Sequence, residues 1–245
     1  MAFATSNGSK IAFETLGTGP TVVMQHGLFG NWHSWQDRGF VSALQADYQL
    51  VLIDSLGHGE SDCPHERARY GLESRAGDIA AVLDDLGVER AHYVGYSMGG
   101  WMGTGVARYH GDRLSSLAIG GWDLKNGAAA AIAQMQIDNF ADIIGAASDM
   151  SEEIAAGIRD GDRVALEACW DALGEIKGAV EGVVATGVPT LVWCVRDDPC
   201  FEAVAELANE IDVRFRAVDG DHVGAMTDLS RQSVESVQAF LAAVR

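Results

Sequence analysis

Short, nearly continuous apolar runs recur along the chain and alternate with longer segments of helical spacing. Such runs occupy residues 21–25, 50–54 and 190–193, and they suit parallel strands that are covered on both faces. Residues 72–86 instead place apolar side chains at helical intervals, and Gly87 follows them. This pattern predicts an amphipathic helix that ends at a glycine. Strands that alternate with helices are typical of a parallel α/β sheet with short crossovers.

The alternation is interrupted once. Residues 122–187 contain segments of helical spacing, among them 128–144, and no convincing strand. The simplest account is a helical insertion between two strands of one sheet, above the edge at which loops carry function. We therefore predict a core formed by residues 1–121 and 188–245, with residues 122–187 inserted into it. Further helices are predicted over residues 32–46 and roughly 230–244.

Composition and charge narrow the class of protein. The chain has 245 residues and a formal net charge of −18, so it has no surplus of cations to neutralise phosphates and we expect no nucleic-acid partner. No apolar run is long enough to span a bilayer, and the first residues have no features of a signal peptide. The four cysteines have no metal-binding spacing. We expect a cytoplasmic protein without a metal ion or cofactor, and its oligomeric state stays open.

A serine lies between two glycines where a predicted strand ends. Residues 95–100 read Gly-Tyr-Ser-Met-Gly-Gly and follow the β-type run 91–94. In such a nucleophile elbow the backbone turns so tightly that glycine is needed at Gly95 and Gly99, and Ser97 is exposed above the sheet. A serine hydroxyl is a weak nucleophile alone, so this turn predicts a base, an acid and an oxyanion site elsewhere. The alternative is that Ser97 only caps the helix that follows.

Seven histidines are candidates for the base. His222 lies in a loop after the last predicted strand, beside the carboxyl edge of the sheet. Its neutral imidazole would accept the Ser97 proton and return it to the leaving group. We interpret the other histidines, which lie in a strand, at a helix end, in polar stretches or in turns, as structural.

Five motifs together resemble a known family. They are His-Gly-Leu-Phe-Gly at 26–30, Asp-Ser-Leu-Gly-His-Gly-Glu-Ser-Asp at 54–62, the elbow at 95–100, Asp-Pro at 198–199 and Gly-Asp-His at 220–222. The chain resembles the α/β-hydrolase fold family over essentially its whole length, in the order serine, acid, histidine. The resemblance implies a mostly parallel sheet flanked by helices, with residues 122–187 as a small helical cap.

The resemblance also implies site residues. In this family the acid commonly lies just before the proline, which selects Asp198. Val195 replaces the usual glycine of the motif, so the adjacent Asp197 stays open as the alternative. The oxyanion donors implied are the backbone N–H groups of Leu28 and Met98, and Met98 begins a helix whose dipole favours negative charge.

Other matching turns are expected to have structural roles. His26 and His58 match family turns in which imidazoles hold loops together. Asp54 also ends a predicted strand, but it precedes Ser97 in the chain. We expect its carboxylate to bond to the backbone of the turn at residues 57–59.

Three aromatic residues are the predicted pocket lining. Phe29 and Trp122 follow strand ends, and Phe140 lies in the predicted insertion. Most other aromatic residues are expected to be in the core. Acidic residues outnumber basic ones in the insertion, and near the entrance they would disfavour polyanionic substrates.

The predicted function is therefore hydrolysis of a small, largely neutral carboxylic ester through an acyl-enzyme on Ser97. Opening of a lactone or enol-lactone, peracid formation or cleavage of a carbon–carbon bond would use the same three residues and stays open. A ligand-sensing signalling protein on this fold is the alternative from another class. In each case the predicted partner is a small molecule such as an ester or lactone.

Overall fold

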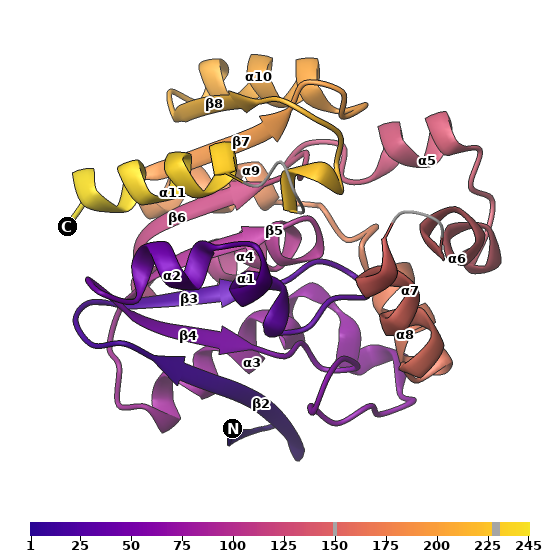
Figure 1. The fold of residues 1–245 in the computed structure, drawn as a ribbon, viewed down its shortest axis with the longest axis horizontal. Coiled ribbons are helices and arrows are strands. Elements are labelled where there is room, and N and C mark those ends of the chain that lie inside the picture. The colour runs from indigo at the N-terminus through magenta and orange to yellow at the C-terminus, as the bar shows by residue number, and fades with distance from the viewer. Residues whose placement is uncertain (149–150, 227–230) are drawn as a thin grey trace.

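The computed structural model describes residues 1–148, 151–226 and 231–245. Within these residues, eight strands form one sheet in the order β1-β2-β4-β3-β5-β6-β7-β8 (Figure 1). The pairs β1–β2 and β2–β4 are antiparallel, and every other neighbouring pair is parallel. The prediction of a mostly parallel α/β sheet is confirmed. The strands are β1 (Ala2–Ser6), β2 (Ser9–Leu16), β3 (Thr21–Gln25), β4 (Gln49–Ile53), β5 (Ala91–Tyr96), β6 (Leu114–Gly120), β7 (Thr190–Val195) and β8 (Arg214–Val218).

Helices cover both faces of the sheet, because adjacent strand residues point to opposite faces and both sets are apolar. In β5, Tyr93 belongs to one core cluster and Val94 to the other. The first face is covered by α3 (Leu72–Asp85), α4 (Met98–Tyr109), α9 (Ala179–Thr186) and α10 (Phe201–Glu210), and the second by α1 (His33–Asp37), α2 (Phe40–Leu44) and α11 (Arg231–Ala243). Short 3-10 turns occur at η1 (Arg67–Tyr70), η2 (Gly111–Arg113) and η3 (Gly224–Met226).

Two helices predicted from spacing are each divided in the structure. The segment 32–46 forms α1 and α2, which are separated at Gly39 with φ 82°. The segment 128–144 forms α5 (Ala129–Met135) and the start of α6 (Phe140–Ser148), and Gln136 between them has φ 53°. Left-handed backbone at one residue ends a helix while the apolar spacing continues past it. The last helix begins at Arg231, and position 230 lies outside the described residues.

Helices α5 to α9 lie between β6 and β7 in the chain, where the insertion was predicted. The remaining two are α7 (Glu152–Asp160) and α8 (Arg163–Ala172), and the side chains of Ser151 and Asp162 accept backbone N–H groups in their first turns. Figure 1 shows α5 to α8 beyond one end of the sheet, whereas α9 packs against α4. The division into core and cap stays a prediction.

No helix among the described residues is both long enough and apolar enough to cross a membrane.

Candidate active site

Ser97 lies in the sharp turn between β5 and α4. Its φ is 54°, a left-handed value that is unfavourable for a residue with a Cβ atom, and its N–H donates to the carbonyl of Gly120 at 2.8 Å. A Cβ at Gly95 would clash with the carbonyl of Gly99, and a Cβ at Gly99 would clash with the carbonyl of Gln25. Both glycines are therefore required by the close approach of backbone, as the elbow motif predicted.

His222 contacts both of the residues that the sequence placed beside it. Its Nε2 atom lies 3.0 Å from Ser97 Oγ, and its Nδ1 atom lies 2.6 Å from Asp198 Oδ2. The hydroxyl of Tyr96 donates to the carbonyl of His222 at 2.6 Å, which holds the loop after β8 against the end of β5. The structure thus brings a hydroxyl, an imidazole and a carboxylate into one hydrogen-bonded row.

Of the two adjacent carboxylates, Asp198 is the one that meets His222. Asp198 is 7% exposed, whereas Asp197 is exposed at the rim of the cavity described below. Burial by itself raises the pKa of Asp198, but the hydrogen bonds from His222 and Cys200 outweigh it and hold the pKa below its usual value. Asp198 therefore stays ionised and can stabilise a positive imidazole.

The second oxygen of Asp198 is held by Cys200. Oδ1 accepts the Cys200 N–H at 3.2 Å and the Cys200 thiol at 3.0 Å. The Sγ atom of Cys194 lies 3.9 Å from that of Cys200, and contact with it, burial and the nearby carboxylate all raise the pKa of Cys200. The Cys200 thiol therefore stays protonated and acts as a donor. These three side chains, with ligand atoms within 4.8 Å of one another, are also the group in the described residues that could hold a metal ion.

The residues predicted to supply oxyanion donors, Leu28 and Met98, belong to two segments that meet at Ser97. Met98 is the first residue of α4, and a Cβ at Gly27 would lie 3.4 Å from the Cβ of Ser97, which places the segment carrying Leu28 beside the hydroxyl. In the described part of the chain neither N–H donates to a protein acceptor. Their role as donors to a negatively charged oxygen stays a prediction.

The loop that carries Leu28 is joined to the loop after β4 by two histidines. The Phe29 N–H donates to His58 Nε2 at 3.2 Å, and the Ser55 N–H donates to His26 Nε2 at 3.0 Å. Both imidazoles accept at Nε2, so both are neutral and carry their proton on Nδ1. Burial lowers the pKa of His26 and of His58, which keeps these acceptors unprotonated.

The carboxylate of Asp54 completes this junction. Oδ1 accepts the Trp32 N–H at 2.8 Å, and Oδ2 accepts the N–H of Glu60, directly after the turn at 57–59, at 2.9 Å. Asp54 thus bonds beside the turn that was predicted for it, and it also holds the neighbouring loop.

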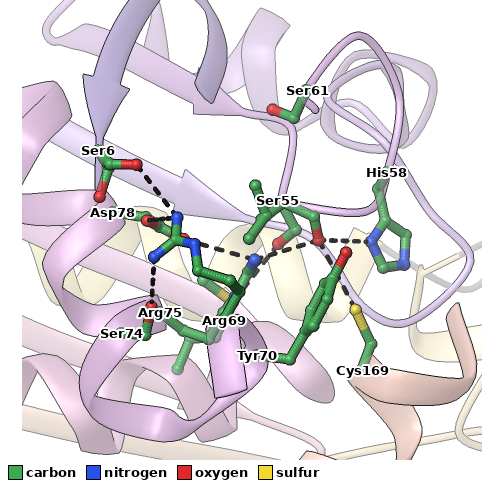
Figure 2. Close-up of polar contacts among 12 residues, drawn as sticks. Ser6, Ser55, His58, Ser61, Arg69, Tyr70, Ser74, Arg75, Asp78 and Cys169 are labelled. Carbon is green, nitrogen blue, oxygen red and sulfur yellow. Dashed lines mark hydrogen bonds and ion pairs between the residues drawn. The ribbon is translucent and has the colours of Figure 1, made fainter. Parts of the chain in front are cut away.

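A buried polar cluster contacts the backbone directly before the turn at 57–59 (Figure 2). The carbonyl of Leu56 accepts Arg75 Nη1 at 3.1 Å, and the Cys169 thiol and His58 Nδ1 lie 3.6 and 3.5 Å from it. Arg75 is 1% exposed and pairs with the buried carboxylate of Asp78 at 3.4 Å. Arg75 of α3 and Cys169 of α8 therefore fix the loop after β4, whose His58 accepts the Phe29 N–H.

A cavity of about 320 Å³ opens beside Ser97 and His222. Phe29 and Trp122 line it as predicted, together with apolar residues of α5 to α8 such as Ile132. Phe140 does not belong to the lining. It packs against Phe29, with ring centroids 6.3 Å apart, in an apolar cluster that also contains Ile137 and Leu166. The prediction of Phe140 as a pocket residue is therefore corrected to a supporting role.

The family described as alpha/beta hydrolase fold matches residues 20–142, half of the chain. The chain belongs to the α/β-hydrolase fold family. Bifunctional epoxide hydrolase 2 of Sus scrofa is 32% identical over 112 residues, which are 45% of this chain and 20% of that protein. Cis-3-alkyl-4-alkyloxetan-2-one decarboxylase of Shewanella oneidensis is 37% identical over 119 residues, which are 48% and 37% of the two chains.

The structural similarity to known proteins covers more of this α/β-hydrolase chain than the sequence similarity does. The matched segments span between 20% and 39% of the curated relatives' lengths. The crystal structure of the enol-lactonase from Burkholderia xenovorans superposes with a TM-score of 0.79 at 22% identity, covering 98% of this chain and all of that one (100%). This level of identity establishes the shared fold.

Several residues of this α/β-hydrolase site were missed by the sequence interpretation. The sequence could have indicated Arg75 and Asp78, because they place charged side chains on the apolar side of the predicted helix 72–86. No sequence pattern could have indicated Cys200, since a cysteine two residues after an aspartate is not a known motif. Arg38 and Glu153, which also line the cavity, are 115 residues apart in the chain.

Proposed function

We propose that this chain is a serine hydrolase that cleaves small, largely neutral carboxylic esters through an acyl-enzyme on Ser97. The observation that carries the proposal is the position of His222, 3.0 Å from Ser97 Oγ and 2.6 Å from Asp198 Oδ2 at the wall of an apolar cavity. A hydroxyl, an imidazole and an ionised carboxylate in this order are the groups that acyl transfer requires.

In the proposed reaction, Ser97 Oγ attacks the ester carbonyl while His222 Nε2 takes the hydroxyl proton. The carbonyl oxygen becomes negative and accepts the N–H groups of Leu28 and Met98. His222 then donates its proton to the departing alkoxide, which leaves as the alcohol. Water attacks the acyl group, with His222 again as base, and the acid is released from Ser97. Asp198 holds the imidazole orientation and stabilises its positive charge throughout.

The cavity supports a small, apolar substrate. Its volume of about 320 Å³ lies at the lower end of the range for small-molecule sites. Helices α5 to α8 contribute lining residues, so we propose that residues 122–187 act as the cap that covers the acyl or alcohol group. The first turn of α4 adds its dipole beside Met98.

The activities stated in the names of the relatives cannot be assigned directly to this chain. Residue 97 is a serine, whereas the epoxide and haloalkane hydrolases of this fold use an aspartate nucleophile, so we expect ester rather than epoxide chemistry. Lactone opening is the second candidate, because a lactone is an internal ester and a structural neighbour is described as an enol-lactonase.

The proposal is tested by steady-state hydrolysis of p-nitrophenyl acetate and butyrate, with lactones assayed in parallel. We expect Ser97→Ala to lower kcat at least about 10³-fold, because the nucleophile is lost. Ser236→Ala removes an exposed hydroxyl on α11 and serves as the matched control. Equal ester hydrolysis by Ser97→Ala would refute the proposal. Rapid labelling of Ser97 by an organophosphate without ester turnover would favour the ligand-sensing alternative.

A further inference from the structure

One wall of the cavity contains an ion pair between the core and the insertion. Arg38 follows α1 and Glu153 lies in α7, and Arg38 Nη1 donates to Glu153 Oε1 at 3.1 Å. Arg38 Nη2 makes a second close contact with Oε2, and the Ser34 hydroxyl also bonds Glu153. The two side chains are 8% and 29% exposed, so the pair is largely removed from water.

Both terminal nitrogens of the Arg38 guanidinium already have hydrogen-bond acceptors. Besides Glu153, Arg38 Nη1 donates to the carbonyl of Ser34 at 2.8 Å. A bidentate arginine–carboxylate pair of this kind uses the donors that would otherwise recognise a carboxylate on a substrate. Glu153 thus stands where the acid group of a substrate would bind.

The other carboxylates that line the otherwise apolar cavity are all aspartates. Asp123, Asp197 and Asp221 line the cavity as well as Asp198, which His222 pairs. Among the cavity-lining residues that the structure describes, Arg38 is the one lysine or arginine. A substrate carboxylate would lose its hydration on entry and meet negative charges without an open cationic partner.

We propose that Glu153 determines substrate class by occupying Arg38, so that the cavity accepts uncharged acyl groups and rejects those that end in a carboxylate. This inference rests on the proposed ester hydrolysis at Ser97. Removing the charge of Glu153 while keeping its shape converts Arg38 into a binding group for a substrate carboxylate.

The experiment compares two isosteric substrates that differ by one negative charge, the p-nitrophenyl half-ester of adipic acid and the corresponding ester of adipic acid monoamide. The suberic acid pair repeats the comparison at a longer reach. We expect the wild-type protein to favour the monoamide ester at least about tenfold in kcat/KM, and Glu153→Gln to shift this ratio at least about tenfold towards the acid. The matched control is Glu152→Gln, which removes the same charge from the next residue, 87% exposed in its side chain.

Equal use of both substrates by the wild-type protein, or equal ratios in Glu153→Gln and Glu152→Gln at both chain lengths, would overturn the inference. If instead the proposed function is wrong, ester hydrolysis will persist in Ser97→Ala, or the wild-type protein will show none. In that case calorimetric binding of adipamic acid and adipamide, which differ by the same charge and contain no ester bond, to the wild-type protein and to Glu153→Gln decides the inference. Tighter binding of the acid only when Glu153 is replaced supports it, and unchanged relative affinity contradicts it.

Discussion

The Nε2 atom of His58 accepts the backbone N–H of Phe29 at 3.2 Å, across 29 residues of sequence. Phe29 has φ 67°, a left-handed value that costs roughly 1–2 kcal/mol in a residue with a Cβ. The hydrogen bond from Phe29 offsets part of this cost and fixes the peptide next to Leu28. We therefore propose that His58 positions the Leu28 N–H, the proposed oxyanion donor, without touching the substrate.

Replacing His58 should lower catalysis more than binding. We expect His58→Leu to reduce kcat about tenfold or more, because the Leu28 N–H loses its fixed direction towards the oxyanion. KM should change by less than about threefold, since the cavity lining is intact. His58→Gln, which can present an amide oxygen to the Phe29 N–H, should recover part of the loss. A variant pair with equal kcat would show that this contact does not matter for turnover.

The buried histidines also predict how stability depends on pH. Burial lowers the pKa values of His26, His58 and His92 below the usual 6.5. Below that value the unfolded chain binds protons that the folded chain does not, so the free energy of unfolding should fall as the pH drops below about 6.5. The lowered pKa of Asp198 acts in the same direction, but below its usual 3.8.

Urea unfolding at a series of pH values measures this dependence. His58→Gln removes one of the three titrations, so its free energy of unfolding should fall less steeply between about pH 7 and pH 5. His33→Gln makes the same substitution at an exposed histidine and is the matched control. A slope in His58→Gln equal to that of the wild-type protein would mean that His58 is not held neutral by the fold.

The Cys200 thiol is expected to matter as a hydrogen-bond donor. Cys200→Ala removes the bond to Asp198 Oδ1, which is made at 3.0 Å, and should lower kcat/KM about tenfold. It should also raise the pKa of Asp198, and with it the acid limb of the pH profile, because hydrogen bonding from Cys200 helps to lower this pKa. Cys200→Ser keeps a donor and should restore both properties. An unshifted profile in Cys200→Ala, measured beside Cys63→Ala, would leave the thiol with a packing role only.

The choice between the adjacent carboxylates can be tested directly. Asp198→Asn should lower kcat about 10³-fold or more, because the imidazole loses its negative partner and its correct tautomer. Asp197→Asn removes the same charge one residue away, from an exposed side chain, and should change kcat less than about threefold. The reverse order of effects would transfer the role of the acid to Asp197.

Much of the fold could be predicted because the signals were local. The apolar runs became β3, β4 and β7, and the glycines of the elbow are required by backbone contacts that any such turn must make. The divided helices were not predicted, because apolar spacing continues through Gly39 and Gln136 while the backbone turns at single residues.

The candidate site was only partly predictable for a similar reason. Ser97, Asp198 and His222 each lie in a motif at the end of a strand, and parallel strands bring such ends to one edge. Phe140 was misplaced because its direction depends on how α6 packs, which its own sequence does not determine. The pair Arg38–Glu153 joins two elements that are separated in sequence by β4, β5 and β6, and no local pattern connects them.

The proposed reaction requires Ser97 to carry an acyl group during turnover. Intact-protein mass spectrometry can detect this group when the protein is quenched with acid while it hydrolyses p-nitrophenyl butyrate, and peptide mapping then locates it. We predict a single butyryl group on the peptide that contains residue 97. Turnover with an unmodified protein, or with the label on another residue, would rule out an acyl-enzyme on Ser97.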